Sequence, residues 1–176
     1  MEQMNLFGEI EDDKIFVSID TETTGLSPVA NELIEISAIK YNRNKKIDTF
    51  STLIKPKNEI PYHITKITGI SNEMVEKSPC IEKVMPELIS FVGSNPLVAH
   101  NANFDMGFLR YNSNNSFMEN EIIDTLELSR KMAPNLPNHK LGTMAKYIGI
   151  TEEGFHRAEF DCECCAMIYM KYNKWI

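Results

Sequence analysis

The sequence predicts one α/β domain in which a mixed five-stranded sheet is flanked by helices. Three β-rich apolar runs come first and are joined by short connections, which is typical of an antiparallel meander. Strands then alternate with helical segments, which is typical of parallel strands that extend the same sheet. The chain has 176 residues, 43% of them hydrophobic, which is ordinary for a single domain with its own core.

The first half of the chain is expected to form the meander. Strands are predicted over 14–20, 33–41 and 49–54, because each range is a short apolar run of high β-propensity. The tight connection over 42–45 favours antiparallel pairing of the second and third strands. The next stretch, 56–68, is expected to be an irregular crossing.

The second half is expected to alternate helices with short core strands. Ser71 is the predicted N-cap of the first helix, because its hydroxyl can accept from a free amide of the first turn. The predicted ranges, in chain order, are helices over 72–76 and 81–92, a strand over 96–100, a helix over 104–111, a strand over 121–124, and helices over 126–132, 141–148 and 158–174.

Residues 1–13 are expected to be a flexible acidic tail, separate from a single domain over 14–176. The tail lacks sustained periodicity but contains one apolar pair, Leu6 and Phe7. No basic stretch followed by an apolar one is found at the N-terminus, and no apolar run reaches the roughly 18 residues of a membrane helix. We therefore expect a cytoplasmic protein without a membrane contact.

The formal net charge of −7 argues against binding nucleic acid by a basic face alone. If the chain handles a phosphodiester backbone, metal ions or a partner protein must supply the attraction.

The cysteines are typical of a reducing compartment. Cys162, Cys164 and Cys165 crowd into one predicted helix at a spacing that suits neither zinc nor bridges between them, so they are expected to pack that helix against the core.

The first chemical signal is the pair Asp20 and Glu22. Residues two apart on a strand point to the same face, so the two carboxylates are expected to project side by side. Carboxylates this close repel each other unless a cation shares them, and Mg²⁺ prefers such oxygen ligands. The alternative is a solvated strand end, but the pair directly follows a buried run, which places it at the rim of the core.

Two further segments carry titratable side chains. His100 closes a predicted core strand and Asp105 falls in the first turns of the next helix, where the helix dipole alone would favour an acid. His156 and Asp161 would lie about 140° apart on one helix. His156 is therefore expected on the loop before the last helix, with Asp161 early in that helix. A loop histidine beside an acidic metal site suits a general base.

These three segments together resemble the signature of the DnaQ-like, DEDDh-type 3′–5′ exonucleases. That signature has Asp-x-Glu after the first strand, His-Asn-x-x-Phe-Asp after the fourth and His-x₄-Asp at the last helix. It is matched in order by 20–22, 100–105 and 156–161. The similarity extends over nearly the whole domain, and the nearest relatives are expected to be the epsilon-type proofreading subunits and exonuclease domains of bacterial DNA polymerase III. The resemblance implies a ribonuclease H-like fold.

The resemblance also implies a two-metal hydrolysis of phosphodiesters. Asp20 is expected to bridge two Mg²⁺ or Mn²⁺ ions, with Glu22 and Asp161 completing one site and Asp105 supporting the other. His156 is expected to take the proton from the attacking water. The expected product is a nucleoside 5′-monophosphate released from a 3′ end, so bound metal would turn an acidic pocket into a phosphate site.

Substrate contacts carry over from the same family. Thr23 and Leu26 are expected to line the pocket for the terminal nucleotide, and Phe104 to stack on a base. Core packing is an equal alternative for Leu26 and Phe104. His63 and Thr68 border the same site in the family. His100 is expected to be a structural hydrogen-bonding residue at a strand end.

The tail offers a second resemblance, to the bacterial peptide that binds the sliding clamp. Gln3 followed by Leu6 and Phe7 matches that pattern, and an extended peptide can bury its apolar pair in a groove. Packing of the pair on the domain itself is the alternative. The expected partners are therefore single-stranded or frayed 3′ ends, with DNA favoured, and a sliding clamp and replicative polymerase.

The sequence predicts a 3′–5′ exonuclease acting on DNA in proofreading or end trimming. A relative of the same fold that trims RNA ends, as ribonuclease T does, is the first alternative, because the choice depends on how the pocket treats the 2′-hydroxyl. A non-catalytic module that binds a polymerase or clamp is the second. Retention of all five catalytic positions argues against the module.

Overall fold

The computed structural model of the chain describes residues 14–150 and 157–176. The predictions for Gln3, Leu6, Phe7 and His156 lie outside the described residues, as does the prediction of a separate tail over 1–13.

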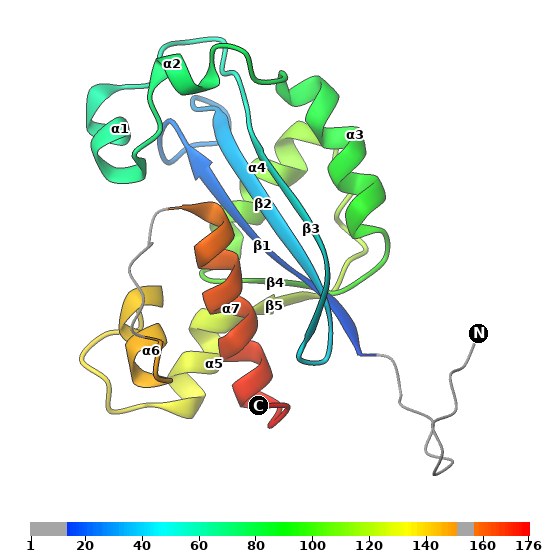
Figure 1. Cartoon of the computed structure of the whole chain (residues 1–176), viewed down its shortest axis with the longest axis vertical. Coiled ribbons are helices and arrows are strands. Elements are labelled where there is room, and N and C mark those ends of the chain that lie inside the picture. The colour runs from blue at the N-terminus through cyan, green and yellow to red at the C-terminus, as the bar shows by residue number, and fades with distance from the viewer. Residues whose placement is uncertain (1–13, 151–156) are drawn as a thin grey trace.

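The described residues form a mixed five-stranded sheet with helices on both faces (Figure 1), as predicted. The strands lie in the order β3-β2-β1-β4-β5. β1 pairs antiparallel with β2, and β2 with β3, while β4 is parallel to both β1 and β5. The strands are β1 (Ile15–Thr23), β2 (Leu33–Asn42), β3 (Lys45–Leu53), β4 (Leu97–Ala99) and β5 (Ile122–Asp124).

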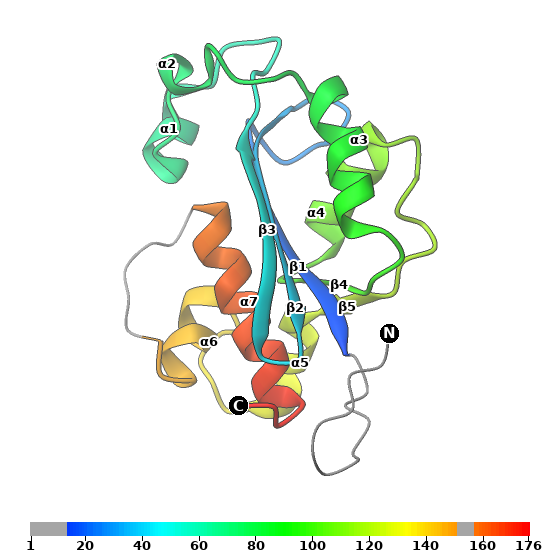
Figure 2. The ribbon, with the colours of Figure 1, turned by 45° about the vertical axis from the view of Figure 1, so that its right-hand side comes forward.

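The helices form two layers with the sheet between them, which Figure 2 shows almost edge-on. α3 and α4 cover one face, and α7 covers the other with α5 and α6 beside it. No helix in the described ranges is long and apolar enough to span a membrane. The helices are α1 (Tyr62–Thr68), α2 (Asn72–Val75), α3 (Ile81–Val92), α4 (Asn103–Asn112), α5 (Thr125–Met132), α6 (Leu141–Tyr147) and α7 (Ala158–Tyr172).

Strand β1 contributes alternately to two cores because successive side chains point to opposite faces. Val17 and Ile19 pack towards α3 and α4, whereas Phe16 packs with Cys162 and Cys165 of α7. The burial of these cysteines confirms that they serve as small packing residues.

The expected irregular crossing over 56–68 is wrong for its second half, which forms α1. Pro61 stands at the N-cap in an extended conformation, and Gly69 ends the helix with φ of 74° while its amide donates to Thr65 O at 2.8 Å. Proline at the start of a helix and a glycine with left-handed conformation after its end are common helix start and stop signals. Seven residues are too few for the apolar period to reveal it.

The meander strands are longer than predicted at their polar ends. β3 begins at Lys45 instead of residue 49, and its first residues are exposed on the outer edge of the sheet, where backbone pairing needs no apolar side chains. β1 continues past Asp20 to Thr23, because its backbone still pairs with β2 as far as Leu33. Because β2 ends at Asn42 and β3 begins at Lys45, the turn between them is shorter than the predicted 42–45.

The predicted N-cap of α2 is confirmed, since the Ser71 side chain accepts a hydrogen bond from Met74 N.

Two hydrogen bonds fix α7 to the middle of the sheet. The buried hydroxyl of Ser18 on β1 donates to Cys162 O at 2.7 Å, although that carbonyl belongs to a helix. The thiol of Cys162 donates to Ser37 O of β2 at 3.0 Å. Because these contacts involve the residue after Asp161, they fix which residues of β1 lie beside that aspartate.

An aromatic cluster joins the start of β1 to the end of α7. Phe16 stacks on Tyr41 with 5.3 Å between ring centroids and meets the edge of Tyr169 at 4.9 Å. Trp175 closes the cluster at 6.1 Å from Phe16 and 5.4 Å from Tyr169. The first strand and the last helix are thus tied together at the end of the sheet away from Asp20.

Replacing Ser18 with alanine is expected to lower the free energy of unfolding by about 1 kcal/mol, because the buried hydrogen bond from the Ser18 hydroxyl to Cys162 O is lost. In thermal denaturation this corresponds to a drop of about 2–4 °C. Ser94→Ala, at an exposed position, is the control and is expected to leave the melting temperature unchanged. Equal melting temperatures for the two variants would contradict the anchoring role of Ser18.

Candidate active site

The acidic site lies where the end of β1 meets the start of α7, two segments that are adjacent in Figure 1. Asp20 and Glu22 project from β1 towards α7, two residues apart on one face as predicted. Asp161 belongs to the first turn of α7, also as predicted, and is buried. One carboxylate oxygen from each of the three lies within 4.8 Å of the other two. Three carboxylates so close form a site for a hard cation.

Asp105 approaches this cluster from the opposite face of the sheet. It lies in the first turn of α4 and is buried, and its Oδ1 accepts a hydrogen bond of 2.7 Å from the Thr21 hydroxyl. Thr21 stands between Asp20 and Glu22 and therefore points to the α4 side of β1. Strand β4 pairs with Val17 and Ser18, further down β1, so α4 reaches the upper part of β1 beyond the end of β4.

Burial and the charges of neighbouring carboxylates raise the pKa values of Asp20, Glu22 and Asp105. For Asp20, burial is the main cause and the charges of Asp105 and Asp161 add to it, so its pKa lies well above the usual value. Burial and the charge of Asp161 raise the pKa of Glu22 to about 8. Burial raises the pKa of Asp105 to about 7, although the hydrogen bond from Thr21 opposes the shift. A bound cation would relieve this repulsion.

The donor set fits divalent metal. All donors are carboxylate oxygens, which Mg²⁺ and Mn²⁺ prefer, and they converge from two elements whose positions are fixed by the sheet. Burial and neighbouring negative charges raise the pKa values of such carboxyl groups, and a bound cation would lower them again. Asp20, Glu22 and Asp161 can therefore hold a metal ion.

The predicted substrate residues divide into exposed and buried groups. Leu26 is 85% exposed on the loop after β1, so the core-packing alternative is wrong for it, and His63 is exposed on α1. Phe104 is half-buried and lies 5.3 Å from the Phe108 ring, at the margin of the core. The hydroxyls of Thr23 and Thr68 are engaged locally, donating to Gly25 O at 2.6 Å and to Ile64 O at 3.1 Å.

His100 has the structural role expected for it. Its Nδ1 lies 2.9 Å from the Thr125 hydroxyl and its Nε2 lies 2.8 Å from His139 O, so both ring nitrogens are engaged. Burial lowers the pKa of this imidazole, which favours the neutral form. His100 thus joins the end of β4 to the start of α5 and to the segment before α6.

Three residues of the site were missed by sequence reasoning: Thr21, Glu35 and Arg157. Thr21 lies within the first motif, and its alternation to the other face of β1 could have identified it as a partner for Asp105. Glu35 interrupts the apolar strand β2, and such an acid in a buried run is itself a signal. Arg157 follows His156 directly, but only the folded chain brings it to Glu35, 122 residues away.

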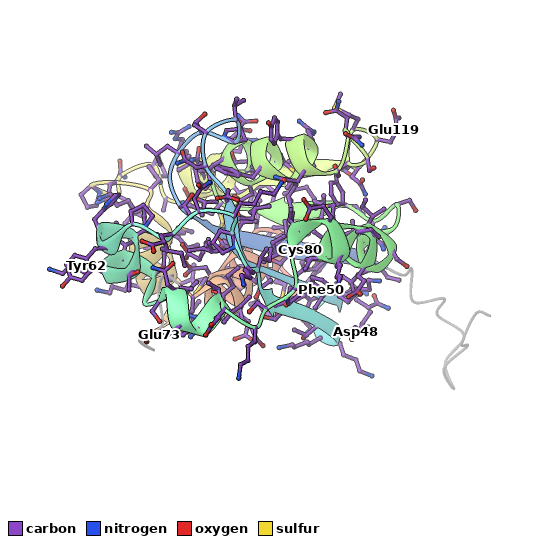
Figure 3. The ribbon with its side chains drawn as sticks, turned by 90° about the horizontal axis from the view of Figure 1, so that it is seen from above. Asp48, Phe50, Tyr62, Glu73, Cys80 and Glu119 are labelled. Carbon is purple, nitrogen blue, oxygen red and sulfur yellow. The ribbon has the colours of Figure 1, made fainter. Side chains whose placement is uncertain are left out.

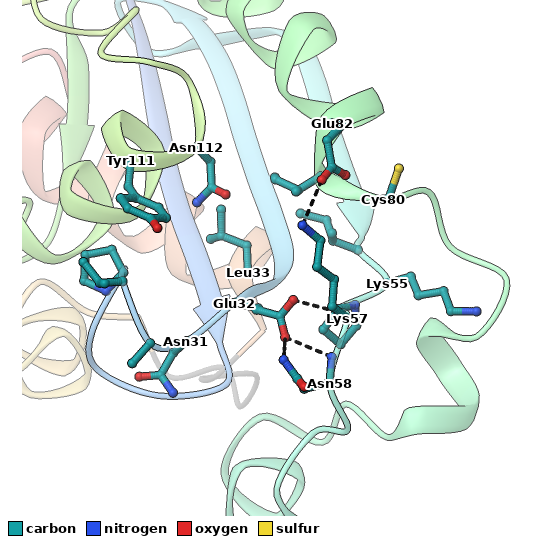
Figure 4. Close-up of a pocket in the computed structure, with 16 residues that line it drawn as sticks. Asn31, Glu32, Leu33, Lys55, Lys57, Asn58, Cys80, Glu82, Tyr111 and Asn112 are labelled. Carbon is teal, nitrogen blue, oxygen red and sulfur yellow. Dashed lines mark hydrogen bonds and ion pairs between the residues drawn. The ribbon is translucent and has the colours of Figure 1, made fainter.

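A hollow of about 280 Å³ lies beside the loop between β1 and β2, separate from the acidic cluster. Figure 4 shows that its charged groups are largely paired with one another. Glu32 accepts from the backbone amides of Lys57 at 2.7 Å and Asn58 at 3.0 Å, and the Lys57 ammonium lies 3.3 Å from Glu82. These contacts fasten the β1–β2 loop to the segment after β3, so we assign this hollow a structural role.

A mixed sheet that presents clustered carboxylates at the end of its first strand could bind a divalent cation there. The sequence model of a protein family described as Exonuclease matches residues 17–169, which is most of the chain. The chain therefore belongs to this exonuclease family, which confirms the resemblance found in the three motifs.

Curated relatives are PolC-type DNA polymerases III. The chain is 43% identical over 158 residues to that of Caldanaerobacter subterraneus subsp. tengcongensis, and 42% identical over 158 residues to that of Clostridium perfringens. In both cases the match covers 89% of this chain but 11% of the relative, so the chain spans about a ninth of the length of these polymerases.

Solved structures share the fold. Exonuclease X in complex with 5′-overhanging duplex DNA is 29% identical, with a TM-score of 0.75 over 90% of this chain and 91% of that one. Exonuclease I has a TM-score of 0.80 at 19% identity, covering 92% of this chain and 41% of the other. These neighbours confirm the ribonuclease H-like fold.

In metal-free protein, the free energy of unfolding is expected to fall relative to a Glu22→Gln variant as the pH is raised from about 5 to about 8. Over this range the unfolded chain has released the Glu22 proton while the folded protein still holds it, so rising pH favours unfolding. Urea denaturation in EDTA measures the difference. A difference that does not change with pH would contradict the raised pKa of Glu22.

Replacing Thr21 with valine is expected to raise the pKa of Asp105 above about 7, because the hydrogen bond that favours its ionised form is lost. Carboxyl NMR titration of metal-free protein measures this pKa directly. Thr52→Val, which removes a hydroxyl on β3 that donates to Leu53 O, is the matched control. An unchanged Asp105 pKa in Thr21→Val would show that the hydroxyl does not tune this carboxyl group.

Proposed function

We propose that this chain is a metal-dependent 3′–5′ exonuclease that releases nucleoside 5′-monophosphates from DNA 3′ ends, in proofreading or end trimming. The observation that carries the proposal is the convergence of Asp20, Glu22 and Asp161 within 4.8 Å, with Asp105 buried beside them. Their order along the chain is that of the DEDDh signature, which supports assignment to this subtype.

The proposed metal content is two Mg²⁺ or Mn²⁺ ions. Asp20, Glu22 and Asp161 would hold the ion at the attacking water, and Asp20 with Asp105 would hold the ion at the leaving oxygen. When bound, such a pair of ions stabilises the charge that develops on both oxygens of the displacement. The chain's own carboxylates would orient the two ions, since two carboxylates are fixed on β1 and the others on the first turns of α4 and α7.

Proton transfer is assigned to His156. Its imidazole would accept a proton from the water as the water oxygen bonds to phosphorus and the bond from phosphorus to the 3′-oxygen breaks. The 3′-oxygen leaves on the shortened strand, and the phosphate stays on the 5′ side of the released nucleotide. Leu26 and Phe104, with Thr23, would contact the terminal nucleotide, and His63 and Thr68 would border it.

DNA is favoured as the substrate by the relatives. The curated relatives named above are DNA polymerases, and exonuclease X was solved with duplex DNA. A replicative polymerase as partner rests on the same relatives. Clamp binding through Gln3, Leu6 and Phe7 concerns residues outside the described ranges and stays a prediction.

Wild-type protein is expected to shorten 3′-tailed DNA in a ladder with Mg²⁺ or Mn²⁺, and EDTA or Asp20→Ala is expected to abolish the ladder. The substitution removes a carboxylate shared by both proposed ions, so we expect a loss of at least about 1,000-fold in rate. Matched RNA and DNA with a mispaired terminus are assayed in parallel. Faster removal of the mispaired terminus supports proofreading.

Asp48→Ala is the matched control for Asp20→Ala. Asp48 is an exposed carboxylate on β3 (Figure 3), in register with Lys40 and hence with Val17, well below the acidic cluster. This variant is expected to cleave like the wild type.

The comparison of substrates has two outcomes that would contradict the proposal. Faster cleavage of RNA than of DNA would replace the DNA proposal by RNA-end trimming. Metal-dependent cleavage of neither substrate would favour a non-catalytic module.

A further inference from the structure

A further carboxylate, Glu35, lies beside the acidic cluster. It stands on β2 directly opposite Glu22 of β1, so both side chains point to the α7 face of the sheet. The side chain of Glu35 is only 4% exposed, and a carboxylate this deeply buried requires partners. Within residues 14–150 and 157–176, its hydrogen-bond partners are Arg157 and Ala158 at the start of α7.

Glu35 binds the start of α7 through three donors. Its Oε1 accepts from Arg157 Nη2 at 3.0 Å, and its Oε2 accepts from Arg157 Nε at 3.4 Å and from Ala158 N at 3.2 Å. The guanidinium therefore donates to both carboxylate oxygens, and this bidentate pairing fixes the relative orientation of the two planar groups. The bond to Ala158 N crosses from the sheet to a helix amide.

This bond replaces the cap that the sequence of α7 does not supply. Helices usually begin with Ser, Thr, Asp or Asn, whose side chains accept from the first free amides. Arg157 occupies the N-cap of α7, and its side chain makes no capping hydrogen bond. Glu35 instead accepts from the first amide of the helix, from a strand more than a hundred residues earlier.

The same contact fixes a metal-ligand candidate. Asp161 lies within one turn of Ala158, so the orientation of this turn sets where its carboxylate meets Asp20 and Glu22. The bond of Ser18 to Cys162 O fixes the helix one residue further on. Glu35 and Ser18 thus hold the first turn of α7 at both of its ends.

We infer that Glu35 and Arg157 form a positioning pair that locks the first turn of α7 against β1 and β2 and so holds Asp161 in the metal site. In its catalytic consequence this inference rests on the proposed function. We assign the pair to positioning because Glu35 contacts Arg157 and Ala158 N. Arg157 also directly follows His156 in the chain.

A purely electrostatic role for the two charges makes the opposite prediction for one variant. If Glu35 only added negative charge beside the cluster, its removal would weaken cation binding, and removal of the Arg157 charge would tighten it. If the pair positions Asp161, removal of either partner weakens cation binding. The direction of the Arg157→Ala effect therefore separates the two roles.

Calorimetric titration of the metal-free full chain with Mn²⁺ provides the test. We expect Glu35→Ala and Arg157→Ala each to weaken Mn²⁺ binding by about 10-fold or more, as removal of outer-shell partners typically does. The double variant is expected to resemble the single variants, because either loss already breaks the pair. Tighter binding in Arg157→Ala, or additive losses in the double variant, would overturn the inference.

Two further variants guard against a general loss of structure. Lys46→Ala breaks another contact between the sheet and α7, the exposed pair with Glu163 at 3.0 Å, and is expected to bind Mn²⁺ like the wild type. Arg157→Lys keeps the positive charge but loses the bidentate hydrogen bonding to Glu35. It is expected to bind Mn²⁺ with an affinity between those of the wild type and Arg157→Ala. Wild-type affinity in Arg157→Lys, or an equal loss in Lys46→Ala, would count against positioning.

Hydrogen exchange separates this inference from the proposed function. The amide of Ala158 is expected to lose protection in Glu35→Ala and to keep it in Lys46→Ala, whether or not the protein cleaves DNA. Where the wild type is active, kcat at saturating Mn²⁺ is expected to fall in Glu35→Ala with little change in KM. An inactive wild type would refute the proposed function only, whereas full protection of Ala158 in Glu35→Ala would refute the pair.

Discussion

Repulsion between carboxylates at the end of β1 is the constraint on which the rest of the structure depends. Asp20, Glu22 and Asp161 are held within 4.8 Å of one another in surroundings that disfavour charge. Left to themselves, such groups would separate. The strands and the start of α7 prevent this, so the fold maintains an unfavourable arrangement that a bound cation would stabilise.

The constraint explains why the site is assembled from segments distant in the chain. A strand gives the most rigid support for two ligands on one face, but a third ligand must come from outside it. Here α7 supplies it from one side, and α4 brings Asp105 from the other, where Thr21 receives it. One strand therefore serves both halves of the site through the alternation of its side chains.

Much of this could be predicted from sequence because it depends on local periodicity. The spacing of Asp20 and Glu22 needs only the two-residue period of a strand, and the position of Asp161 needs only the start of a helix. α1 was missed because its seven residues are too short to show a period. Glu35 and Arg157 were missed for a different reason: their contact is tertiary, and a single sequence records each residue but not the pairing.

The aromatic cluster at the other end of the sheet has a topological consequence. Because Phe16 near the start of β1 packs against Trp175 just after α7, the two ends of the described fold emerge side by side, away from the carboxylates. Compact units with adjacent ends can be spliced into a host polypeptide while disturbing little of either. The related polymerase of Caldanaerobacter subterraneus subsp. tengcongensis matches this chain over 11% of its own length, so a similar unit occurs within a much longer polypeptide. The contact between Phe16 and Trp175 thus suits the described fold to a place between other segments of a longer chain.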